Sequence, residues 1–100
     1  MLYAISSQFI DDCLEKRQQA RPAHLERLTV LQNQGRLVLA GPHPAIDSED
    51  PGPAGFSGSL IVVEFDSLQS AQTWADTDPY AKAGIYAQVT VKPFIQVFPK

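Results

Sequence analysis

His24 is the residue of this sequence whose type and position most favour acid–base chemistry. Its spacing from Leu28 and Leu31 places it on the inward-facing side of a predicted helix. Arg17 and Arg21 continue the same line toward the N-terminus. An imidazole gains and loses a proton near neutral pH, and a nearby carboxylate is enough to fix its tautomer. The pattern favours either a general base or acid, or a half-buried histidine that is hydrogen-bonded to the backbone.

Asp78 is the acidic residue best placed to pair with His24 if the two meet in the fold. It precedes Pro79, and an Asp-Pro-Tyr sequence is typical of a helix start, where a carboxylate is held rigidly. A helix cap alone would also explain Asp78, and one carboxylate could serve both roles. Arg21 could hold a carboxylate or phosphate of a small ligand, or remain a solvated or ion-paired charge. Tyr80 could line the same pocket or pack in the core.

Other chemistries find little support in the spacing of the residues. Ser59 is not part of a Gly-x-Ser-x-Gly sequence, which argues against a serine hydrolase. The chain has no glycine-rich phosphate loop, no dinucleotide-binding motif and no Cys/His cluster with zinc spacing. We therefore expect neither a metal nor a cofactor. His43 lies in a proline-rich segment and is expected to be exposed.

The composition is that of one globular domain, residues 1–100. Hydrophobic residues make up 44% of the chain, and the net charge of −3 gives no basic surface for nucleic acid or for an anionic membrane. No apolar run approaches the roughly 20 residues of a membrane span. The single cysteine, Cys13, excludes an intramolecular disulfide and suits a reducing cytoplasm, where we expect the protein to be located.

The pattern of apolar residues predicts strands and helices that are joined by polar or proline-rich segments. In chain order these are a strand Leu2–Phe9, a helix from a cap at Asp11 or Asp12 to about Gln34, a strand Arg36–Gly41, a strand Ser59–Phe65, a helix capped by Asp66 or Ser67, a short turn from Asp78 to Gly84, and a strand from Ile85 to about Phe98. Pro22 has no backbone N–H, so we expect a bend or break around Gln19–Arg21. The proline-rich segment Gly41–Gly58 is expected to form a long loop, either a functional flap or a mobile surface excursion. Pro93 marks an edge position or a bulge.

This order of elements is typical of an α+β fold of the ferredoxin-like βαββαβ kind, an antiparallel sheet with helices on one face. Those helices cover only one face. Leu2–Phe9 and Ser59–Phe65 are nevertheless apolar on both sides, and the last strand becomes so at Phe94 and Phe98. The second face needs a partner, so we expect a homodimer packed sheet to sheet.

Several short motifs resemble, in the same order, those of YciI-like (YCII-related) proteins. They are Arg-Pro-Ala-His-Leu at 21–25, Gly-Arg-Leu at 35–37 with Ala-Gly-Pro at 40–42, Gly-Phe-Ser-Gly-Ser at 55–59, Asp-Pro-Tyr at 78–80, Ala-Gly at 83–84 and Val-Lys-Pro-Phe at 91–94. The resemblance spans nearly the whole chain and implies a dimeric α/β-barrel architecture with a cleft near the open end of the sheet. It also implies His24 and Asp78 as a catalytic pair. Gly41, Pro42 and Ser59 match family motifs and are expected to take part in substrate binding.

Different kinds of function are compatible with these residues. The first is a cofactor-free enzyme of lyase or isomerase type, in which His24 takes a proton from a small anionic organic molecule. Asp78 would then orient the imidazole, and Arg21 or loop backbone would hold the substrate's charge. The second is a non-catalytic dimer that binds a small ligand or a partner protein. A third is a structural role with a vestigial pocket.

Overall fold

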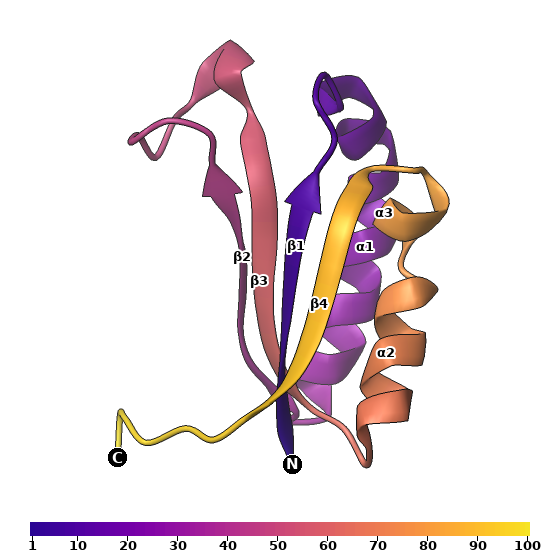
Figure 1. The fold of residues 1–100 in the computed structure, drawn as a ribbon, viewed down its shortest axis with the longest axis vertical. Helices are drawn as coiled ribbons and strands as arrows, with labels where there is room; N and C mark the ends of the chain where they lie inside the picture. Colours follow the sequence, from indigo (N-terminus) through magenta and orange to yellow (C-terminus); the bar gives the residue numbers. More distant parts are fainter.

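A four-stranded antiparallel sheet forms one layer of the molecule, and the helices form a second layer on one of its faces (Figure 1). The structure is a computed structural model that describes residues 1–100. In chain order its elements are β1 (Leu2–Phe9), α1 (Leu14–Asn33), β2 (Leu37–Pro44), the 3-10 helix η1 (Gly52–Ala54), β3 (Phe56–Glu64), α2 (Leu68–Asp76), α3 (Pro79–Lys82) and β4 (Tyr86–Phe94). The strands lie in the order β2-β3-β1-β4, so the predicted ferredoxin-like fold is confirmed. None of its helices combines the length and the apolar character needed to cross a membrane.

The core lies between the helices and the central strands β1 and β3. Tyr3 and Ile5 of β1 pair with Val63 and Ile61 of β3, and all four side chains are buried. Because successive side chains of a strand point to opposite faces, these residues form one row beneath the helices. Leu31 of α1 packs into the same cluster. This packing fixes the long helix α1 against the sheet.

The predicted break around Gln19–Arg21 is wrong, because α1 is one continuous helix with Pro22 in its interior. A proline inside a helix removes one backbone hydrogen bond and costs about 3 kcal/mol. The helix nevertheless buries His24, Leu28 and Leu31 on the side that faces the sheet. Most helical stability in proteins comes from such packing, which here outweighs the local preference of proline.

The N-termini of the crossover helices α1 and α2 are capped in different ways. Neither Asp11 nor Asp12 caps α1; its N-cap is Cys13, and no side chain accepts a hydrogen bond there. Asp12 instead has a φ of 54°, in the left-handed region, and turns the chain between β1 and α1. The expected cap of α2 is confirmed for Ser67, whose Oγ accepts from the backbone N–H of Ser70 at 3.1 Å.

Strand β2 is longer than predicted, and the loop after it is shorter. The loop spans residues 45–55 instead of Gly41–Gly58, and it contains η1. β2 continues to Pro44 because it is an edge strand. A proline nitrogen has no proton to donate, and at an edge it can face away from the neighbouring strand without the loss of a ladder hydrogen bond.

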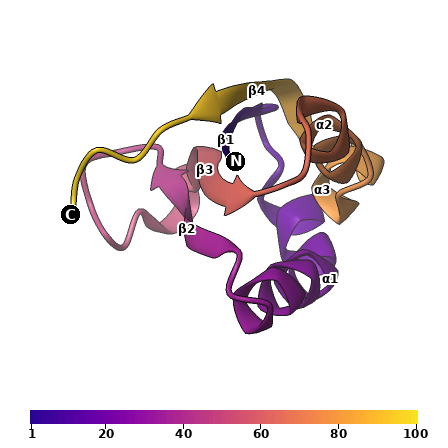
Figure 2. The same ribbon diagram turned by 90° about the horizontal axis from the view of Figure 1, so that it is seen from below.

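Strand β4 is shorter than predicted, since it ends at Phe94 and not near Phe98. It forms the opposite edge of the sheet, which agrees with the edge position predicted for Pro93. The tail beyond Phe94 runs away from the helices (Figure 2), and its apolar side chains Ile95, Val97 and Phe98 are exposed.

Gly58 of β3 lies so close to β1 that a side chain would not fit. A Cβ atom at Gly58 would collide with the backbone carbonyl oxygen of Ser7. We expect Gly58→Ala to lower the free energy of unfolding by about 1 to 3 kcal/mol, as overpacking does. Gly41→Ala is the control, because a Cβ there meets nothing within 4 Å. Urea titration checks both, and an equal effect of the two substitutions would contradict this account.

Candidate functional site

His24 and Asp78 meet in the fold although they are 54 residues apart in the chain. The Nδ1 atom of His24 lies 2.8 Å from Oδ1 and 2.9 Å from Oδ2 of Asp78. Only 6% of the His24 surface and none of the Asp78 surface is exposed. A carboxylate oxygen accepts hydrogen bonds, so in the neutral ring Nδ1 carries the proton and Nε2 keeps its lone pair.

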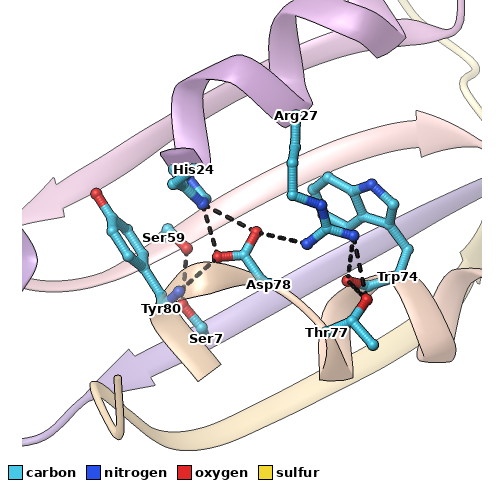
Figure 3. A network of polar contacts seen from close by, with 8 residues as sticks. All are labelled: Ser7, His24, Arg27, Ser59, Trp74, Thr77, Asp78 and Tyr80. Atoms are coloured by element: carbon cyan, nitrogen blue, oxygen red, sulfur yellow. Dashed lines mark hydrogen bonds and ion pairs between the residues drawn. The ribbon is translucent and has the colours of Figure 1, made fainter. Parts of the chain in front are cut away.

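The Asp78 carboxylate is held by further donors around it (Figure 3). Its Oδ1 accepts from the backbone N–H of Tyr80 at 2.9 Å, which makes Asp78 the N-cap of α3. Its Oδ2 accepts from Nη1 of Arg27 at 3.3 Å. The same carboxylate therefore caps a helix and binds the histidine, so the two alternatives considered for Asp78 hold together.

Arg27 links the carboxylate to the end of α2. Its Nη2 donates to the Trp74 carbonyl oxygen at 3.0 Å and to Oγ1 of Thr77 at 3.2 Å. Its guanidinium carbon also lies 4.3 Å from the centre of the Trp74 ring, a cation–π contact. These contacts hold the cation in place beside Asp78 (Figure 3). A buried carboxylate with such a partner is far less costly than an isolated one.

Tyr80 covers one face of the imidazole. The rings of His24 and Tyr80 are stacked, with centroids 4.0 Å apart and an angle of 8° between their planes. Burial raises the pKa of the Tyr80 hydroxyl, while the charges of Arg17 and Arg21 oppose this rise. Burial, assisted by the charge of Asp78, also raises the pKa of Tyr86. Both rings are therefore uncharged at neutral pH and can serve as apolar walls.

A cavity of about 140 Å³ lies between α1 and strands β2 and β3, and His24 lines it. Four other residues singled out in the sequence also line it, namely Arg21, Gly41, Pro42 and Ser59. Asp78 and Tyr80 do not line this cavity. Asp78 contacts the Nδ1 atom of His24, and Tyr80 contacts a face of its ring. Since Nδ1 is bound to Asp78, Nε2 is the ring nitrogen left for a ligand.

A larger and more open hollow of about 670 Å³ lies beneath the 45–55 loop. Arg17 and Phe9 line both hollows, but His24 lines only the smaller one. The acid–base geometry therefore belongs to the smaller cavity. His43 is exposed, as expected.

Ser59 is buried and is joined to a second serine. Its Oγ lies 2.7 Å from Oγ of Ser7, which is also buried. The two residues face each other in the pairing of β1 with β3. This hydrogen bond fixes the hydroxyl of Ser59 at the wall of the cavity.

No role in the site was predicted for Arg17, Arg27 or Ser7. Arg27 follows His24 by three residues, and this helical spacing could have placed it near the same carboxylate. Arg17 lies on the line of His24, but its type favoured an exposed position. Ser7 gives no local signal, because its partner is brought to it only by the pairing of strands.

Comparison with known proteins is informative over nearly the full length. The sequence matches the YCII-related domain over residues 1–95. It is 59% identical over 98 residues to the protein YciI of Escherichia coli O6:H1, covering 98% of this chain and 100% of that protein. It is 53% identical, with the same coverage, to an uncharacterized protein of Haemophilus influenzae. A protein of Emericella nidulans named derivative of benzaldehyde biosynthesis cluster protein C is 36% identical over 83 residues, 79% of each chain.

The fold is similar to that of a solved enzyme, the 5-chloro-2-hydroxyhydroquinone dehydrochlorinase of Burkholderia phenoliruptrix AC1100 in complex with 2,5-dihydroxybenzoquinone. The TM-score is 0.82, with 24% identity, and the match covers 95% of this chain and 94% of that one. This similarity supports the α+β fold. The resemblance noted in the sequence is confirmed by the domain match and the full-length relatives, and the chain belongs to the YCII-related family.

Proposed function

We propose that this protein is a small-molecule enzyme that catalyses a proton transfer or an elimination, with His24 as the general base. The proposal rests on the two contacts between His24 Nδ1 and the buried Asp78 carboxylate. They leave Nε2 as the free basic atom of a residue that lines a cavity. Asp78 orients the imidazole and stabilises the imidazolium that forms when Nε2 takes a proton.

An elimination at this site would need no reagent other than the substrate and the base. Nε2 takes a proton from a carbon atom of the substrate, and the electrons of the C–H bond form a double bond. The leaving group on the neighbouring carbon departs with its bonding pair. Dehydrochlorination, the activity in the name of the structural neighbour, is a reaction of this class. That enzyme supports the reaction class by shared fold, and the site residues carry the argument for this chain.

The cavity limits the size of the substrate. Its volume of about 140 Å³ is close to that of an engineered cavity that binds benzene, about 150 Å³. A small organic molecule fits, and a nucleotide does not. Arg21 and the backbone at Gly41 and Pro42 belong to the proposed binding site, and the hydroxyl of Ser59 offers a hydrogen bond.

Replacement of His24 tests the mechanism. A thermal-shift screen of small organic acids and lactones identifies ligands, which are then assayed for turnover. We expect His24→Gln to lower kcat by about 10²- to 10⁴-fold, the usual contribution of a general base. The variant should lose turnover and keep its fold, because glutamine cannot accept the proton of the substrate. His43→Gln, which changes the other, exposed histidine, is the control.

The same assay separates catalysis from binding alone. If a substrate is turned over and His24→Gln keeps full activity, the base mechanism is wrong. If His24→Gln weakens the binding of a ligand that the wild-type protein never converts, the protein is a binding module.

A homodimer through the open face of the sheet is part of the proposal. Leu39 lies opposite Val62 across the β2–β3 ladder, on the face away from Ile61 and Val63, and 49% of its surface is exposed. Phe94 of β4 is also exposed, at 40% of its surface. Apolar side chains gathered on an uncovered sheet face indicate an interface, and a second copy of the same face is complementary to it.

Sedimentation velocity tests this assembly. We expect Leu39→Lys to shift the protein toward the monomer, because a charge would be buried in the interface. Val30→Lys is the control, since Val30 is a similarly exposed apolar residue on the helical side, at 55%. A wild-type protein that sediments as a monomer, or a Leu39→Lys dimer as stable as the wild type, would contradict the proposal.

A further inference from the structure

Arg17 of α1 is a buried cation without a counter-ion. Only 8% of its surface is exposed, and its Nε has no hydrogen-bond partner. Both ion pairs of the structure belong to Asp78, one with His24 and one with Arg27. An unpaired charge inside a protein is costly, so such a group calls for a partner that completes it.

Aromatic rings explain how the guanidinium is accommodated but not what its N–H groups bind. Its central carbon lies 4.2 Å from the ring centre of Phe56 and 5.9 Å from those of Phe9 and Tyr80. Rings of this kind stabilise the flat faces of a guanidinium. The N–H groups point outward in the plane of the group, and the rings supply no acceptor for the buried Nε–H.

The position of Arg17 connects this unmet requirement to the cavity of His24. Arg17 and His24 lie seven residues apart on one helix, and both line the 140 Å³ cavity. Both also contact the ring of Tyr80. Arg21 lines the cavity as well, but it is exposed, so water can solvate its charge without a counter-ion. Of the two arginines, the buried one gains more from an anion, because attraction is stronger where water is excluded.

We infer that Arg17 binds an anionic oxygen of the ligand, and that the ligand is a small organic acid whose carboxylate pairs with this guanidinium. The inference deepens the proposed function and rests on it for the location of the ligand beside His24. Arg17 selects and orients the acid, and His24 then faces the part of the molecule that is not charged. The substrate's charge is thus assigned to Arg17 and not to Arg21 or the loop backbone, the two alternatives considered from the sequence.

Binding of matched probes tests this role. Benzoate and 2-furoate are compared with their uncharged amides by isothermal titration calorimetry. We expect the wild-type protein to prefer each carboxylate by about ten-fold or more, the strength of a hydrogen bond to a charged group. Arg17→Met keeps an apolar stem between the rings and should remove the preference. Arg36→Met, which changes a half-buried arginine outside the cavity, should leave it unchanged.

An NMR titration of the wild-type protein gives a readout that does not depend on a folded variant. The ¹⁵N–¹H resonance of the Arg17 Nε group should shift on addition of formate or benzoate. The inference is overturned if this resonance does not move, if the carboxylate preference survives in Arg17→Met, or if Arg21→Met removes the preference instead.

His24→Gln separates this inference from the proposed function. The variant should keep the carboxylate preference, since Arg17 is intact, even where turnover is lost. If the wild-type protein binds the anions without any turnover, the base mechanism is contradicted and the role of Arg17 is supported. If turnover depends on His24 but shows no preference for carboxylates, the base mechanism is supported and the role of Arg17 is contradicted.

Discussion

The buried carboxylate of Asp78 is the group on which the rest of the site depends. It has no exposed surface, and it accepts hydrogen bonds from the His24 ring, the Tyr80 backbone and the Arg27 side chain. Removing one of these donors would leave a charge that is poorly compensated inside the protein. The hydrogen bonds that these donors make to the Asp78 carboxylate hold α1 and the start of α3 together. The geometry that frees Nε2 of His24 follows from that requirement.

The continuity of α1 is the second constraint. Arg17, His24 and Arg27 come from this one helix, so their spacing is set by its rise of about 1.5 Å per residue. A break at Pro22 would have separated Arg17 from the two residues that contact Asp78. Packing of the helix against β1 and β3 keeps the three side chains in register, at the local cost that proline imposes. Core packing and site geometry are therefore achieved by the same contacts.

Local patterns predicted a large part of the fold and of the site. The order of strands and helices and the inward position of His24 followed from periodicity, and the rigid Asp78 followed from the Asp-Pro sequence. The break near Pro22 was wrong, because a propensity rule does not include tertiary packing. The burial of Arg17 could not be predicted, since the rings that enclose it come from β1, β3 and α3. The ends of β2 and β4 depend on which strands form the edges, and that order is not visible in either strand alone.

The tautomer of His24 decides whether its Nε2 atom can accept a proton from a substrate. A long-range ¹H–¹⁵N correlation spectrum of the wild-type protein, at a pH where the ring is neutral, shows which ring nitrogen carries the proton. We expect a proton on Nδ1, bound to Asp78, and an unprotonated Nε2 that is available as a base. A proton on Nε2 would contradict it, because the atom assigned to the substrate would then be a donor.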